Sequence, residues 1–301
     1  MMESHELKIL YEDNHLISVV KPAGVLSQSD GSGAQDMLTI LSEDIARRKG
    51  KAGKAFVGLI HRLDRNVGGA MVFARTSKGA SRAGEDMRSG NFYKGYLALT
   101  DRQPECDDEG YLRNRLKKDE TVNRVYPSSD GKDCVLYYKF LCRSGGKFIY
   151  FAVPVTGRPH QIRAQFALAG APLCGDNKYG GDAERAKKGA AVSAGFAGAP
   201  ASGALQDAKK TGHSGGAAVL SRSPAPAAKE APAFPELGLW STIVSLRKTV
   251  DRSERLWLRA LPEGDIWLSP EGVFPEKVRD FIYSTEVEEL LERIKNDGKK
   301  V

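Results

Sequence analysis

The stretch His61-Arg62-Leu63-Asp64-Arg65, followed by the apolar run Ala70-Met71-Val72-Phe73-Ala74, decides how this chain is organised. The run predicts a buried strand, and the charged pentapeptide occupies the loop that enters it. The pentapeptide sets the carboxylate of Asp64 between two guanidinium groups. Clusters of this kind are often ion-pair networks at the start of a strand. Flanking arginines also keep a carboxylate ionised, as a nucleophile requires.

Other strands and helices are expected on both sides of this stretch. Strands are predicted around an Asp13-Asn14 turn and over residues 92–100, 135–141 and 148–155. Helices are predicted over residues 36–48, from Ser77 as N-cap to about Arg88, and from Pro159 to Gly170. Because strands dominate and helices lie between them, we expect a fold of the α+β class.

The chain has 301 residues, enough to bury a sizeable core, and a formal net charge of +7. A basic balance favours a polyanionic partner, because Lys and Arg release counterions from phosphates. No apolar run is long enough to cross a bilayer, and the polar start does not read as a signal peptide. We therefore expect a cytoplasmic protein with no membrane association. Four scattered cysteines and five dispersed histidines offer no closely spaced ligand set, which predicts no metal.

The composition changes between about residues 183 and 235. This stretch is rich in Ala, Gly, Ser, Pro and Lys, and it has few large apolar residues. Such a composition cannot bury enough apolar surface to offset the entropy of ordering. We expect a flexible insertion at 183–235 within a single domain that spans residues 1–301.

A second cluster, Gly157-Arg158-Pro159-His160-Gln161-Ile162-Arg163, sets two arginines at a helix N-terminus. Cations there oppose the positive end of the helix dipole, so Arg158 and Arg163 make better sense beside a carboxylate or a phosphate. The alternative is that both side chains reach into water. On an earlier strand, Tyr96 shares a face with Lys94. Tyr96 is either a core residue or an aromatic that stacks an unpaired base beside a cation.

Several segments, in this order, resemble the RluA family of pseudouridine synthases. The matching segments are Lys21-Pro22-Ala23-Gly24-Val25, His61 to Arg65 with Gly69 and the strand to Ala74, Lys94-Gly95-Tyr96-Leu97-Ala98, Gly157 to Arg163, and Gly175-Asp176-Asn177-Lys178-Tyr179-Gly180. They span roughly residues 7–182, with a fainter likeness from Leu237 to Leu261. Since the likeness starts near Leu7, the small N-terminal RNA-binding domain of many relatives is expected to be absent.

The resemblance implies a mixed, mostly antiparallel sheet flanked by helices, with the active-site cleft across it. It also implies isomerisation of uridine in ribosomal or transfer RNA, without a cofactor, by a protein expected to be a monomer. By the same likeness, Asp64 is the essential carboxylate, Tyr96 packs on the target base and Arg163 pairs with Asp64. Arg62 is expected to hold or replace the flipped nucleotide. The predicted substrate-binding set is completed by His61, Arg158 and Lys94.

Two other interpretations stay open. The first is a non-catalytic RNA-binding or RNA-remodelling protein on the same fold, against which the retention of Asp64, Tyr96 and Arg163 argues. The second is a hydrolase of nucleosides or glycosides. Those enzymes usually need two catalytic carboxylates, and the sequence offers one convincing candidate. Release of free uracil would favour the hydrolase.

Overall fold

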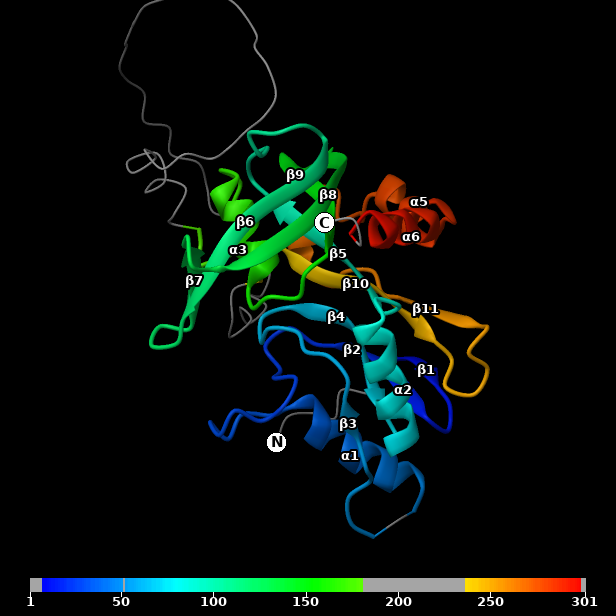
Figure 1. Ribbon diagram of the computed structural model, residues 1–301. Helices are drawn as coiled ribbons and strands as arrows, with labels where there is room; N and C mark the ends of the chain where they lie inside the picture. The colour runs from blue at the N-terminus through cyan, green and yellow to red at the C-terminus, as the bar shows by residue number, and fades with distance from the viewer. Residues whose placement is uncertain (1–6, 51, 181–235, 299–301) are drawn as a thin grey trace, which may run out of the picture.

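The computed structural model describes residues 7–50, 52–180 and 236–298. These residues form one eleven-stranded sheet in the order β1-β2-β4-β10-β5-β9-β8-β6-β7, with β11 paired to β10 and β3 paired to β4. All the pairings are antiparallel except that between β4 and β10. The predicted α+β class, with a mixed and mostly antiparallel sheet, is confirmed (Figure 1). The insertion predicted at 183–235 lies outside the described residues.

The elements follow the chain in a simple order. The strands are β1 (Ile9–Glu12), β2 (Leu16–Lys21), β3 (Gly58–Leu59), β4 (Gly68–Ala74), β5 (Tyr93–Thr100), β6 (Glu109–Asp119), β7 (Arg124–Pro127), β8 (Lys132–Ser144), β9 (Lys147–Pro154), β10 (Leu239–Arg247) and β11 (Arg255–Arg259). The helices are α1 (Met37–Arg48), α2 (Ser77–Arg88), α3 (Gln161–Leu168), α5 (Glu276–Tyr283) and α6 (Glu286–Gly298), with a 3-10 turn η1 (Asp265–Trp267).

Local sequence signals explain where the first helices begin. The side chain of Asp36 accepts hydrogen bonds from the backbone N–H groups of Leu38 and Thr39 and so caps α1. The predicted cap of α2 was one residue late. Thr76 has the extended backbone of an N-cap and accepts from the N–H of Gly79, while Ser77 already belongs to the helix. Helix α3 begins at Gln161, two residues after the predicted Pro159.

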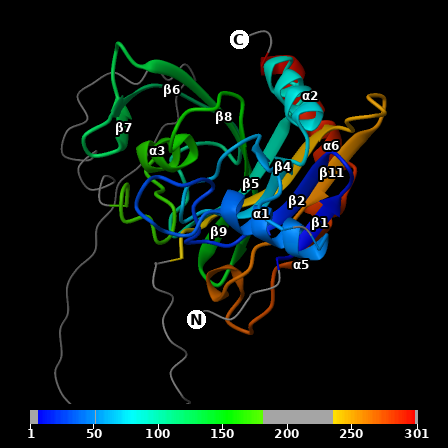
Figure 2. The same cartoon turned by 90° about the horizontal axis from the view of Figure 1, so that it is seen from below.

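The helices pack in two large apolar cores, and α3 also contributes to a third, smaller one. One core joins α1 and α3 to residues of β2, β4, β5, β8 and β9. The other core packs α2, α5 and α6 against strand residues that alternate in sequence with those of the first core. On β5, for example, Tyr96 and Ala98 belong to the first core, whereas Leu97 and Leu99 belong to the second. Figure 2 shows α1 beside β1 and β2, and α3 beside the arm formed by β6 and β8.

Close backbone approach fixes the start of β4, directly after the Asp64 loop. A Cβ at Gly69, where φ is 121°, would lie 2.2 Å from the carbonyl oxygen of Ser241 on β10. A Cβ at Gly68 would lie 2.3 Å from the ring of Trp240. Since no larger residue fits, the two glycines let β4 pair with β10 and fix where the preceding loop emerges.

Candidate active site

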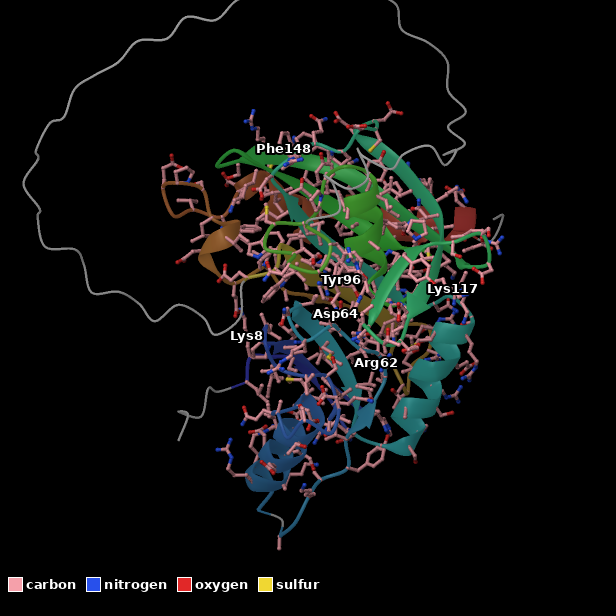
Figure 3. The ribbon with its side chains drawn as sticks, turned by 90° about the vertical axis from the view of Figure 1, so that its left-hand side faces the viewer. Lys8, Arg62, Asp64, Tyr96, Lys117 and Phe148 are labelled. Atoms are coloured by element: carbon pink, nitrogen blue, oxygen red, sulfur yellow. The ribbon has the colours of Figure 1, made fainter. Side chains whose placement is uncertain are left out.

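All the site residues predicted from the sequence border one cleft of about 1310 Å³. Its wall includes the 26–30 loop, the 59–67 segment, residues of β5, and the 154–163 segment. The nominated residues in this wall are His61, Arg62, Asp64, Lys94, Tyr96, Arg158 and Arg163. Figure 3 shows Asp64 and Tyr96 close together near the middle of the molecule, with Arg62 nearby. The structure therefore brings together residues that lie up to about a hundred positions apart in sequence.

The backbone on both sides of Asp64 is pinned by buried polar side chains. Lys21 is fully buried, and its Nζ donates to the carbonyl oxygens of Pro22, Val25 and Arg65 at 2.9, 2.7 and 3.1 Å. Ser27 exchanges two hydrogen bonds with the backbone of Leu63, one in each direction. Burial lowers the pKa of Lys21 to about 7, and the nearby carboxylate of Asp64 opposes this shift. The loop that carries Asp64 is thus held on both sides.

Asp64 meets its cation from a distant segment. Nη1 of Arg163 donates to Oδ2 of Asp64 at 3.2 Å, while Nε and Nη2 of Arg163 each contact Asp176 at 2.8 Å. Burial disfavours the charge of Arg163, but the hydrogen bonds and charges of Asp176 and Asp64 outweigh burial and raise its pKa. The side chain of Asp176 is 0% exposed and that of Asp64 is 32% exposed. A ligand can therefore reach Asp64 but not Asp176.

A histidine also faces Asp64. Nε2 of His160 lies 3.8 Å from Oδ2 of Asp64, and Nδ1 lies 2.9 Å from the hydroxyl oxygen of Tyr179. That hydroxyl oxygen accepts a hydrogen bond of 2.9 Å from the N–H of Val125. Burial lowers the pKa of His160 despite the attraction of Asp64. Burial therefore favours the neutral form of this imidazole.

Strand β5 carries the aromatic and the lysine of the cleft. Tyr96 is 7% exposed, and burial, with a smaller effect of Asp64, raises its pKa, so the phenol stays protonated. Burial also lowers the pKa of Lys94. Within residues 7–50, 52–180 and 236–298, Lys94 has no hydrogen-bond or ion-pair partner. Lys94 is half-buried, and a half-buried ammonium without an anionic partner attracts an anionic ligand.

His61 is committed to the fold. Its Nε2 accepts a hydrogen bond of 3.1 Å from the N–H of Val72 on β4, and its ring packs on Phe92 at a centroid distance of 5.3 Å. Burial and the charge of Lys94 lower the pKa of His61 to about 3. The ring is therefore neutral and supports the strand behind Asp64. Its contact with a substrate stays a prediction.

Arg62 and Arg158 lie at the rim of the cleft and point outward. For Arg158 this agrees with the alternative interpretation that its side chain reaches into water. Arg62 and Arg158 are both exposed. Nε of Arg158 makes a long contact of 3.4 Å with the carbonyl oxygen of Asp133, and within the described part of the chain Arg62 has no hydrogen-bond or ion-pair partner. Both guanidinium groups are free to approach a polyanion at the mouth of the cleft.

Sequence reasoning gave no role to several residues that build the site. Asp176, His160, Tyr179 and Lys21 stand in the segments that carry the family resemblance, but no periodicity or charge pattern singles them out. Within the described residues, no group of three or more His, Cys, Asp or Glu side chains is placed to hold a metal ion. None of the helices there is long and apolar enough to cross a membrane.

Comparisons with known proteins agree with the family resemblance seen in the sequence. Residues 15–168 match the family profile described as RNA pseudouridylate synthase. The ribosomal large subunit pseudouridine synthase C of Rickettsia bellii is 32% identical over 178 residues, which are 58% of this chain and 57% of the relative. The ribosomal large subunit pseudouridine synthase D of Xanthomonas campestris is 31% identical over 181 residues, which are 58% of this chain and 52% of the relative. The matched part spans little more than half of these relatives.

Two solved structures share the fold. Human RNA pseudouridylate synthase domain containing 4 superposes with a TM-score of 0.56 at 18% identity, covering 84% of this chain and 88% of its own. Human RNA pseudouridylate synthase domain containing 1 gives a TM-score of 0.55 at 16% identity, covering 85% of this chain and 84% of its own. At these identities the likeness concerns the fold alone.

Proposed function

The chain belongs to the RNA pseudouridylate synthase family, and on that premise we propose that it converts uridine in RNA to pseudouridine. One observation carries the proposal. Asp64 is a partly exposed carboxylate in a cleft large enough for a nucleotide, and the buried pair of Arg163 and Asp176 holds it in place. A single oriented carboxylate beside an aromatic ring and an unpartnered cation suits a reaction on one flipped base.

The proposed reaction is an isomerisation that needs no outside reagent. The N1–C1′ bond of uridine breaks, the uracil ring turns, and C5 bonds to C1′ in its place. C5 then loses its proton and N1 gains one, so atoms and electrons balance. The carboxylate of Asp64 acts as the nucleophile, either by attack on the sugar or by assisting departure of the uracil anion. Arg163 holds this carboxylate in a fixed orientation through the hydrogen bond to Oδ2.

Each remaining cleft residue has a proposed task. Tyr96 packs its ring on the target base, since every base has a face that an aromatic can stack. Lys94 donates to a phosphate or carbonyl oxygen of the flipped nucleotide inside the cleft. Arg62 and Arg158 contact the RNA at the mouth, and Arg62 fills the gap left by the base. His61 is assigned support of the substrate-binding wall.

We propose large-subunit ribosomal RNA as the substrate, with transfer RNA as the next class to test. The support is that the relatives named above are ribosomal large subunit enzymes. We also propose that the protein acts as a monomer. We also propose a cytoplasmic site of action.

A pseudouridine map of cellular RNA tests the proposal. RNA is mapped from cells that carry either the wild-type protein or the Asp64→Asn variant. We expect a defined set of sites to vanish in the variant, which would also identify the substrate. An unchanged map, with the variant folded and expressed at the normal level, would leave a non-catalytic role on RNA as the better interpretation.

The hydrolase interpretation is separated by its product. A second cleft carboxylate, Asp30, accepts a hydrogen bond from the N–H of Ser32 in an exposed turn. If Asp30 and Asp64 acted as a glycosidase pair, incubation with RNA would release free uracil. We expect rearranged nucleoside and no free uracil, measured by chromatography of the digested RNA and of the supernatant.

A further inference from the structure

His160 adopts a backbone conformation that its side chain disfavours. Its φ of 50° and ψ of 19° lie in the left-handed region, immediately before α3 begins. A residue with a Cβ persists there only where its surroundings enforce it, and Gly would be the unstrained choice. The side chain makes no capping bond to the helix. The imidazole therefore needs a reason other than helix capping to occupy this position.

The hydrogen bonds around the ring indicate which nitrogen carries the proton. The hydroxyl oxygen of Tyr179 already accepts from the N–H of Val125 and lies 2.9 Å from Nδ1 of His160. Its own hydrogen is then best donated to Nδ1, which places the ring proton on Nε2. Nε2 is the nitrogen that faces Oδ2 of Asp64. An N–H in that position is attracted by the carboxylate, whereas a lone pair would be repelled.

Two side chains thus face the same oxygen of Asp64, and one of them is within hydrogen-bond distance. Arg163 reaches Oδ2 at 3.2 Å and Nε2 of His160 stands 3.8 Å from it. Within the described residues, Oδ1 of Asp64 has no hydrogen-bond or ion-pair partner. Oδ1 is therefore the oxygen left to react with a ligand, and the orientation of the carboxylate depends on what holds Oδ2. Contacts of this length between catalytic groups often tighten in the complex with substrate.

We propose that His160, held by Tyr179, is a positioning residue that presents a neutral Nε2–H to Oδ2 of Asp64 and turns Oδ1 toward the substrate. This inference rests on the proposed function, since it assigns a task within that reaction. The donor is uncharged, so it orients the carboxylate without adding a second full positive charge beside Arg163. His160 itself does not exchange atoms with the substrate.

The test compares two amide substitutions at residue 160, Gln and Asn. They distinguish a need for a hydrogen-bond donor at the position of Nε2 from a need for the left-handed backbone conformation. Gln places its amide nitrogen about where His places Nε2, whereas Asn reaches only the position of Nδ1. Asn, however, tolerates the left-handed region better than Gln. A purely structural role for residue 160 therefore predicts that His160→Asn is the milder change. A donor to Asp64 predicts that His160→Gln is the milder change.

The substrate for this test is RNA from cells that carry Asp64→Asn and were grown with uridine tritiated at C5. Tritium release reports the loss of hydrogen from C5. We expect His160→Gln to keep kcat within about threefold of wild type and His160→Asn to lose roughly 10- to 100-fold, with KM changed less than about twofold in both, because a hydrogen bond to a charged group is lost only in the second variant.

A third variant tests the same inference even if the Gln variant fails to fold. Tyr179→Phe keeps the imidazole but removes the hydroxyl that fixes its tautomer, and it should lower kcat about three- to tenfold with KM unchanged. Equal kcat values for the Asn and Gln variants, or a kcat of Tyr179→Phe equal to wild type, would overturn the inference. Failure of wild type to release tritium would instead reject the proposed function, so the two failures are distinct.

Discussion

Arg163 donates two hydrogen bonds of 2.8 Å, from Nε and Nη2, to the carboxylate of Asp176, and its Nη1 donates to Asp64. The pair with Asp176 is buried, and the N–H groups of Lys178 and Tyr179 also donate to Oδ1 of Asp176. The guanidinium is thereby fixed in its plane before any ligand arrives. Asp64 is held by a rigid partner, which favours a reaction that depends on the angle of one carboxylate.

Asp176→Asn should destabilise the protein strongly, because it leaves the buried charge of Arg163 with only half of its anionic partners. Breaking a buried pair in this way costs about 3–5 kcal/mol, and we expect a loss of this size in the free energy of unfolding measured with urea. The control is Asp133→Asn, which breaks an exposed pair with Arg115 at 3.6 Å. The control should lower the free energy of unfolding by less than about 1 kcal/mol. Equal losses in both variants would contradict a stabilising role of the buried pair between Arg163 and Asp176.

Asp64→Asn should separate activity from stability. The side chain of Asp64 is 32% exposed, and Arg163 keeps its buried partner when Asp64 is neutral. We expect a change of less than about 1 kcal/mol in the free energy of unfolding, near-normal RNA affinity and no pseudouridine formation. Urea unfolding, filter binding and the tritium-release assay give the three values. Measurable turnover in the purified variant would remove Asp64 from the role of nucleophile.

The ring of Tyr96, rather than its hydroxyl, should carry RNA affinity. Measured in the Asp64→Asn background to prevent turnover, Tyr96→Phe should keep the dissociation constant within about twofold, whereas Tyr96→Leu should weaken binding about tenfold, since stacking on an aromatic is worth about 1–3 kcal/mol per base. Leu preserves an apolar side chain at this core position. Equal affinities for the Phe and Leu variants would mean that Tyr96 does not stack on the base.

The parts of the fold that depend on local pattern were predictable from sequence. Apolar spacing placed a helix over 36–48, and α1 covers Met37–Arg48. Strand alternation also puts Tyr96 and Leu97 on opposite faces of β5, and the structure assigns the two residues to different cores. These signals work because the period of side chains along a helix or strand follows from backbone geometry.

The partners of Asp64 depend on tertiary structure: the family likeness implied Arg163, but no local sequence pattern did. Its neighbour in sequence, Arg62, is exposed, and the contact is made instead by Arg163 from a helix 99 residues away. The general argument that an arginine at the start of a helix needs an anion was correct for Arg163. That the anion is Asp176, in a loop without periodicity, follows only from how α3 packs against that loop.

Protonation of His61 should limit stability in mild acid. Its folded pKa is about 3, below the ordinary value of 6.5, so between these pH values the unfolded chain binds a proton that the folded protein excludes. Stability from this group is complete above pH 6.5 and declines as pH falls toward 3. Between pH 7.5 and 5, wild type should lose about 2 kcal/mol that His61→Gln does not lose. Urea unfolding at both pH values measures this difference, and parallel losses in the two proteins would refute it.

Two neighbouring lysines on β6 test whether RNA extends along the cleft. Lys118 lines the cleft, whereas Lys117 points to the other face of the strand and lies at the edge of the molecule, away from Asp64 (Figure 3). Each lysine pairs with one surface carboxylate, Glu120 for Lys118 and Asp130 for Lys117. The two positions are therefore matched in charge and local pairing, and they differ in the face they occupy.

Lys118→Gln should weaken RNA binding and lower the slope of log affinity against log salt by about 0.7–0.9, the value for loss of one phosphate contact. Lys117→Gln should leave both quantities unchanged, because its ammonium cannot reach RNA held in the cleft. Both are measured in the Asp64→Asn background by titration at several salt concentrations. If the two variants behave alike, the RNA does not run over this part of β6, and the path from Asp64 must leave the cleft toward Arg62 and Arg158 instead.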